Sequence, residues 1–325
     1  MDYRQLQIER QKVIFKAYQL GGIFDNKNYE FVLKDFKDNF AKQIIKEDIL
    51  EYFKDNEIGW WKGQSPTGHT LSSQIACLNH LYAIRRDYDA VLAIARKINN
   101  EFDGVEILTN DKRNWQGYIS FEVVSETDHL NEKKGKSKKL TRGGLCTSID
   151  AVILATNKGK RVLLTLEWKY VEKYGNDDKS KNSSKGNCGD TRLNRYCGSY
   201  DVVDANLIQN STQLKNTENY KSSVYFFEPF YQLMRQTLWA EQMVKYQEDE
   251  VIKADEYINV HVVPIKNTQL RDKKYKCSGL DMYSTWKNQL TDPTKYVLIS
   301  PDILMENLPE DYKELKDYLK NRYWL

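Results

Sequence analysis

The chain has 325 residues, of which 40% are hydrophobic and 29% charged, with a net charge of +3 at pH 7. This length allows one large domain or two small ones with a real core. No run of eighteen apolar residues is present and the N-terminus is polar, so neither a membrane span nor a signal peptide is expected. Five cysteines without a CxxC pair predict free thiols in the reducing cytoplasm.

The N-terminal part is expected to be helical and to pack on the rest of the chain. Apolar residues recur at helical spacing in four segments, residues 3–20, 28–55, 70–84 and 87–99. The third segment opens with Ser72, Ser73 and Gln74. Their hydroxyls suit helix capping, and a contact with phosphate at this helix start is the less favoured interpretation.

Residues 117–124 alternate and are rich in aromatic side chains, which predicts a strand. Glu122 interrupts this strand. It either faces solvent, as alternate strand residues often do, or supplies a carboxylate to the site described next, and the sequence leaves both readings open.

Residues 147–170, TSIDAVILATNKGKRVLLTLEWKY, contain two apolar runs around a short polar break. This pattern predicts an antiparallel β-hairpin. If Lys158 and Gly159 form a two-residue loop, Asp150 lies directly opposite Glu167, with Cβ atoms about 5 Å apart. Lys169, two residues beyond Glu167, points to the same face.

Two carboxylates this close repel each other unless they share a cation. Because the ligands are oxygen atoms, Mg²⁺ is the natural candidate. The hairpin therefore predicts half of a metal site, with the ammonium of Lys169 beside it.

Basic residues are concentrated in the two polar segments that flank the hairpin. A charge run is usually a solvated loop, but two of them beside an acidic hairpin favour a groove for a polyanion. The residues expected to contact the phosphate backbone there are Lys138, Lys139, Arg142, Arg192 and Arg195.

The C-terminal third supplies further elements of an α/β fold. Helices are predicted over residues 226–247, 279–290 and 309–321, and strands over 257–265 and 296–300. Gln232, Arg235 and Gln236 occupy one side of the first of these helices. Strands that are apolar on both faces need helices on both sides, so we expect an α/β/α sandwich with a mixed central sheet. The expected division is a helical region over 1–110 and a core over 111–325, in one compact unit.

Asp150, the hairpin, and Glu167-Trp168-Lys169 followed by a helix and a strand resemble the PD-(D/E)XK nuclease superfamily, with Ile149 where the proline would stand. The segments SPTGHTLSSQIACLNHL, TSIDAVIL, LEWKYVEKY and FYQLMRQTLWAE are similar to a bacterial restriction-endonuclease-like group. Together they cover most of residues 65–245.

The resemblance implies Mg²⁺, or Mn²⁺ as a substitute, bound by Asp150, Glu167 and the Trp168 carbonyl. It gives Lys169 the role of holding the attacking water and stabilising the phosphate charge. Gln232 matches the glutamine-bearing helix of related nucleases. Gln236, which stands where some relatives have tyrosine, and Arg235 would contact phosphate.

The resemblance implies a DNA endonuclease of restriction or phage defence, with no membrane partner. A cut in both strands would suit a homodimer. A repair or recombination nuclease of the same fold is the alternative. A nucleic-acid-binding protein without catalysis is disfavoured because Asp150, Glu167 and Lys169 are all present. A purely structural protein leaves their burial unexplained.

Overall fold

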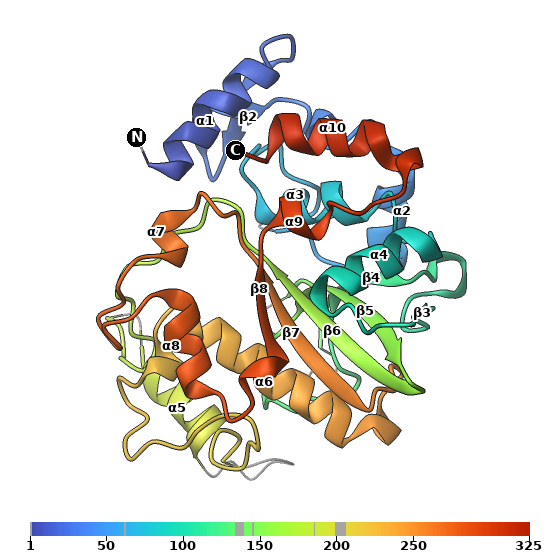
Figure 1. Cartoon of the computed structure of the whole chain (residues 1–325). Helices are drawn as coiled ribbons and strands as arrows, with labels where there is room; N and C mark the ends of the chain where they lie inside the picture. The colour runs from blue at the N-terminus through green and yellow to red at the C-terminus, as the bar shows by residue number, and fades with distance from the viewer. Residues whose placement is uncertain (1, 62, 134–139, 145, 185, 199–205) are drawn as a thin grey trace.

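The computed structural model describes residues 2–61, 63–133, 140–144, 146–184, 186–198 and 206–325. A mixed sheet of six strands forms the centre of this part of the chain (Figure 1). The strands are β3 (Gly104–Glu106), β4 (Ile119–Val123), β5 (Ile149–Asn157), β6 (Lys160–Trp168), β7 (Glu256–Val262) and β8 (Tyr296–Ile299). The expected α/β fold with a mixed central sheet is confirmed.

Neighbouring strands are antiparallel in one half of the sheet and parallel in the other. Its order is β3-β5-β6-β7-β8, and β4 pairs with β5 next to β3. The pairs of β5 with β3, β4 and β6 are antiparallel, whereas β6, β7 and β8 run parallel. The β5–β6 hairpin therefore lies at the junction of the two halves, covered on both faces.

Helices cover both faces of the sheet (Figure 1). One face carries α1 (Tyr3–Ile14), α2 (Lys46–Asp55), α3 (Ser73–Leu81), α4 (Tyr88–Ile98), α9 (Pro301–Leu304) and α10 (Lys313–Arg322). The other carries α5 (Cys188–Cys197), α6 (Phe230–Lys245), α7 (Thr268–Arg271) and α8 (Met282–Gln289). No helix among the described residues combines the length and apolar character needed to cross a membrane.

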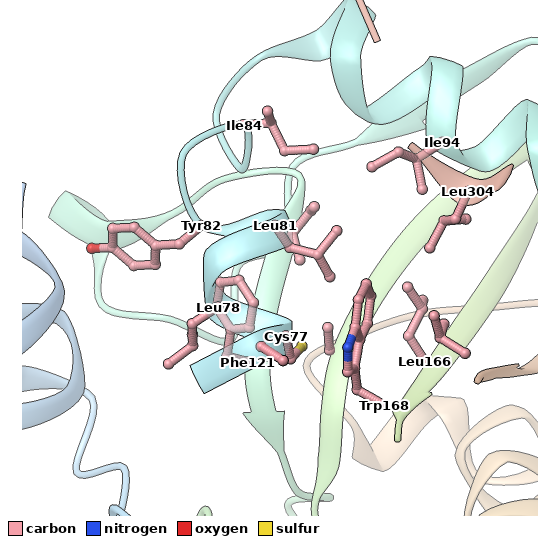
Figure 2. Packing of buried hydrophobic residues seen from close by; sticks show 14 of the residues in the cluster. Cys77, Leu78, Leu81, Tyr82, Ile84, Ile94, Phe121, Leu166, Trp168 and Leu304 are labelled. Atoms are coloured by element: carbon pink, nitrogen blue, oxygen red, sulfur yellow. The ribbon is translucent and has the colours of Figure 1, made fainter. Parts of the chain in front are cut away.

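Two apolar cores result, because successive strand residues point to opposite faces. Ala151 and Ile153 of β5 pack in the first core, and Val152 packs in the second. Figure 2 shows the first core, in which Trp168 of β6 lies beside α3 and Leu304 of α9. Burial of this large indole fixes the end of β6, where the charged residues begin.

The expected helix over residues 28–55 is wrong in its first half. That half begins instead with β2 (Lys27–Leu33), which pairs with β1 (Leu20–Phe24) in a two-stranded sheet. Asp25 and Asn26 join the strands with positive φ angles of 52° and 61°, a conformation that Asp and Asn tolerate and that tight hairpin turns require. Within residues 28–55, α-helix begins only at Lys46, after a short 3-10 helix over Phe36–Asn39, so the first 110 residues are helical in part.

The other predicted helices and strands are present with shifted ends, but the polar segment after the hairpin also contains α5, which the sequence did not indicate. The last residues then close the fold. Arg322 is fully buried and donates to the Asn39 carbonyl at 2.7 Å and to Gln11 Oε1 at 3.2 Å. Tyr323 Oη accepts from Asn79 of α3 at 2.7 Å. These bonds hold α1 and α3 against the end of the chain (Figure 1).

Candidate active site

The register of the β5–β6 hairpin is the predicted one. Asn157 pairs with Lys160 and Ala151 with Leu166, and the loop residues Lys158 and Gly159 both have positive φ. Asp150 and Glu167 come at the next position of this register. Asp150 Oδ2 accepts the backbone N–H of Trp168 at 2.7 Å, which holds the carboxylate at the end of the strand pair.

On the side of α6, the carboxylate of Glu167 is enclosed by polar groups of the protein. Lys169 Nζ lies 2.5 Å from Glu167 Oε1 and 2.7 Å from Gln232 Oε1. Gln232 Nε2 donates to Glu167 Oε1 at 2.5 Å, and Gln236 Nε2 donates to Glu167 Oε2. Because residues four apart share one face of a helix, α6 presents both amides to the same carboxylate.

This cluster is nearly inaccessible to solvent, with Glu167 3% and Lys169 6% exposed. Burial disfavours the ammonium of Lys169, but the charge of Glu167 outweighs that effect, and the pKa of Lys169 lies well above its ordinary value. Lys169 is therefore a fixed positive charge at neutral pH.

On the other side lies a cavity of about 200 Å³ that we call the acidic pocket. Glu122 and Asp150 line it together with Ser73, Gln74 and Ser148. Glu122 Oε1 accepts from Gln74 Nε2 at 2.7 Å, and Glu122 Oε2 accepts from Ser148 Oγ at 3.0 Å. Glu122 is buried, so of its two readings the solvent-facing one is wrong.

The backbone explains how Glu122 reaches this pocket. Its φ is +49°, and the residues on either side of it, Phe121 and Val123, pair with Ala151 and Ile149 of β5. A left-handed residue inside a strand re-aims the side chains around it. Accordingly, Phe121 packs in the first core and Val123 in the second, although both are odd-numbered positions of one strand.

The two carboxyl groups of the acidic pocket are destabilised as anions. Burial raises the pKa of Asp150 well above its ordinary value, and the charges of Glu167 and Glu122 raise it further. Burial also raises the pKa of Glu122, against the hydrogen bonds from Gln74 and Ser148. Negative charge at the hairpin end thus exceeds what Lys169 neutralises.

The donor chemistry of this end suits a hard divalent cation. Asp150, Glu167 and Glu122 offer carboxylate oxygens, the ligands that Mg²⁺ prefers. Among the residues that the structure describes, no three His, Cys, Asp or Glu side chains already converge as a ready ligand set. The residues therefore fit such an ion in chemical type and in their surplus of negative charge.

Two of the arginines expected to contact phosphate point into the protein. Arg142 Nη1 lies 2.8 Å from Asp111 Oδ1, and its Nε donates to the Glu122 carbonyl at 3.2 Å. Arg235 Nη2 lies 3.1 Å from Glu132 Oε1. Both guanidinium groups are thus engaged by carboxylates of the protein.

The other basic residues lie in the flanking segments. Arg192 and Arg195 are half-buried on α5, with guanidinium carbons 5.9 Å from the ring centres of Tyr231 and Tyr196, respectively. Lys138 and Lys139 lie outside the described residues.

Sequence reasoning did not identify Ser148 as a site residue and treated Gln74 mainly as part of a helix cap. Ser72 does cap α3, since its side chain accepts from the backbone of Ile75. Gln74 instead turns to Glu122, a residue 48 positions away, and its Oε1 accepts the Trp61 N–H at 3.1 Å. The polar helix start was the available signal, but only the fold shows what it faces.

A family model described as Restriction Endonuclease associating with ARP matches residues 12–324. The chain belongs to this family. The match includes β4, the β5–β6 hairpin, α3 and α6, so every element of the candidate site lies within it. Membership of this restriction endonuclease family indicates a nuclease that acts on DNA. No curated protein and no solved structure matches the chain.

Proposed function

We propose that this member of the restriction endonuclease family is a metal-dependent DNA endonuclease of the PD-(D/E)XK type that acts in restriction or phage defence. The observation that carries the proposal is the end of the β5–β6 hairpin. There Asp150 and Glu167 lie just beyond the last paired residues, and Lys169 forms a buried ion pair with Glu167.

Mg²⁺, or Mn²⁺ in its place, would be held by Asp150, Glu167 and the Trp168 carbonyl, with Glu122 close by. When bound, such an ion supplies Lewis-acid stabilisation of the charge that develops on the phosphoryl oxygens. It would also relieve the repulsion by Glu167 and Glu122, which adds to burial in raising the pKa of Asp150.

The protein's own groups have three tasks in this proposal. Lys169 directs a fixed ammonium at the developing phosphate charge, a form of preorganised electrostatic stabilisation. Gln232 and Gln236 hold the carboxylate of Glu167 in one orientation through the bonds described above. Gln74 and Ser148 do the same for Glu122 on the opposite side.

The DNA backbone would reach the site through the acidic pocket, which opens beside the first turn of α3. Free N–H groups at a helix start favour phosphate oxygens, and Ser73 lines the pocket there. Arg192 and Arg195 would add positive charge on the α5 side. Cutting both strands would suit a symmetric homodimer.

Incubation of the purified protein with plasmid DNA and Mg²⁺ tests this function. We expect cleavage that requires the metal and is absent in Asp150→Asn. Sequencing of the ends then separates the alternatives, because discrete ends mean a restriction enzyme and scattered ends favour a repair nuclease. A natively folded protein that cuts no DNA with either metal would disprove the catalytic proposal.

A further inference from the structure

A second cavity lies between residues 63–68 and the hairpin formed by β1 and β2. We call it the hairpin pocket, after the β1–β2 hairpin and not the β5–β6 hairpin of the candidate active site. Its volume is about 670 Å³, within the roughly 300–1,000 Å³ typical of sites for small organic groups. The lining residues that matter for its chemistry are Gly22, Phe24, Asn28, Lys34, Trp61 and Gly68. The mechanism proposed above uses none of them.

The floor of the hairpin pocket is built by close backbone packing. A Cβ atom at Gly22 would lie 2.5 Å from the Leu33 carbonyl oxygen, and one at Gly68 would collide with the same oxygen. The N–H of Leu33 donates to the Gly68 carbonyl at 2.9 Å, which ties the two segments together. Glycine is therefore required at both positions to keep this floor.

One wall of the hairpin pocket is an aromatic stack. The rings of Phe24 and Trp61 are 5.1 Å apart between centroids and inclined by 27°. Trp61 is still 45% exposed, so part of the indole surface is accessible to a further flat group. Exposed aromatic rings of this kind are stacking platforms for nucleobases. Asn28 and Lys34 add polar groups at the rim that can bond to base edges or a phosphate.

The hairpin pocket adjoins the candidate active site through one residue. Trp61 also lines the acidic pocket, together with Asp150 and Glu122. Its backbone N–H donates to Gln74, and the amide of Gln74 donates to Glu122. A nucleotide with its phosphate at Asp150 therefore has the hairpin pocket as the adjacent cavity.

We propose that the hairpin pocket takes up a nucleobase of the strand being cut and stacks it against Trp61. The inference rests on the proposed nuclease function and adds a specificity subsite to it. A base inside a duplex is covered on both faces by its neighbours, so the base that enters must be extrahelical or single-stranded.

Binding measurements in the catalytically inactive background Lys169→Met, with Mg²⁺ present, test the proposal. The probes are single-stranded and frayed-duplex oligonucleotides that carry 2-aminopurine at successive positions. We expect a change of fluorescence at one position and its loss in Trp61→Ala, with binding about five- to one-hundred-fold weaker. Trp61→Phe should retain both signals within about threefold, since a ring remains to stack.

Two further variants keep the test sharp. Tyr283→Ala on α8 removes a similarly exposed ring outside both pockets and should bind like the parent. Asn28→Phe fills the hairpin pocket from an exposed position of β2, and we expect it to abolish the fluorescence change without altering Trp61.

Unchanged affinity and fluorescence in both Trp61→Ala and Asn28→Phe would overturn the base pocket. Metal-dependent cleavage by the wild type would still stand in that case. If the wild type shows no cleavage at all, the proposed function itself fails. The two failures are therefore distinguishable.

Discussion

Asp150 and Glu167 occupy facing positions of one hairpin, yet their surroundings differ. Glu167 meets the ammonium of Lys169 and the amides of Gln232 and Gln236. Asp150 accepts a backbone N–H, and burial and the charges of Glu167 and Glu122 raise its pKa against the smaller opposing effect of Lys169. The α6 side of the site is thus balanced by the protein, and the α3 side is not.

The two sides therefore suit different tasks. The α6 side holds Glu167 in one orientation, and the α3 side would accept the proposed metal ion. A buried charge is costly unless it is paired and hydrogen-bonded. The α6 side meets that requirement with its own groups. On the α3 side, burial and the charges of Glu167 and Glu122 raise the pKa of Asp150, and the metal ion proposed above would bind there.

Lys169→Met should have the largest effect, because it removes the balancing charge. We expect cleavage to fall at least about 100-fold. The free energy of unfolding should fall by about 3 kcal/mol, since Glu167 stays buried without its cation. Plasmid cleavage and urea unfolding measure the two effects. Lys160→Met at the start of β6, which breaks an exposed ion pair with Glu256 of β7, serves as the control and should leave both unchanged.

Asp150→Asn tests the unbalanced side. In the wild type, Mg²⁺ at 100 times its dissociation constant should raise the free energy of unfolding by about 2.7 kcal/mol. The variant should lose most of this gain, yet be at least as stable as the wild type in EDTA. Thermal unfolding with and without the metal makes the measurement. Equal stabilisation of both proteins by Mg²⁺ would show that the ion binds elsewhere.

Gln236→Leu loosens the balanced side without changing its charge. A hydrogen bond to a charged group contributes about 1.5–3 kcal/mol, so we expect cleavage to fall roughly tenfold as Glu167 loses its orientation. Gln242→Leu is the matched control on the same helix. Gln242 is also buried, and its Oε1 has no partner within the described part of the chain. Similar rates for the two variants would argue against an orienting role for Gln236.

A smaller effect is expected in the pH dependence of stability without metal. The folded pKa of Glu122 lies above its ordinary 4.5, so the folded state binds the proton more tightly than the unfolded state. The stability that this proton contributes is complete below pH 4.5 and is lost as the pH rises through the folded pKa. The loss amounts to about 1.4 kcal/mol for each pH unit that separates the folded pKa from the unfolded one. Glu122→Gln should flatten the curve of unfolding free energy against pH in EDTA, and parallel curves for the two proteins would contradict this.

The hairpin could be predicted closely because strand periodicity is strict. Once Lys158 and Gly159 were placed in the loop, the facing positions of Asp150 and Glu167 followed. Spacing also showed that Gln232 and Gln236 share one helix face. The placing of Gln232 near the site came from the resemblance to related nucleases, and Gln236 was expected to contact phosphate, whereas its amide donates to Glu167.

The remaining features depend on partners far away in the sequence. Arg235 is paired with Glu132, about a hundred residues earlier, and the sequence shows its charge but not that partner. The left-handed backbone of Glu122 is rare for a Glu and has no sequence signal. Strand β2 was taken for the start of a helix because short apolar runs fit both periods.

The bonds made by Arg322 and Tyr323 constrain the order in which the site can form during synthesis. Asn79 lies on α3, the helix that also carries Gln74, and its amide cannot make its hydrogen bond to Tyr323 until Tyr323 has been made. The hydrogen bonds that Asn39 and Gln11 accept from Arg322 likewise cannot form before Arg322 is made. The ribosome makes Arg322 and Tyr323 after the β5–β6 hairpin and α6. The growing chain therefore carries its acidic residues before α3, the helix beside their pocket, is held in place, and the acidic pocket should form fully only after Tyr323 has been made.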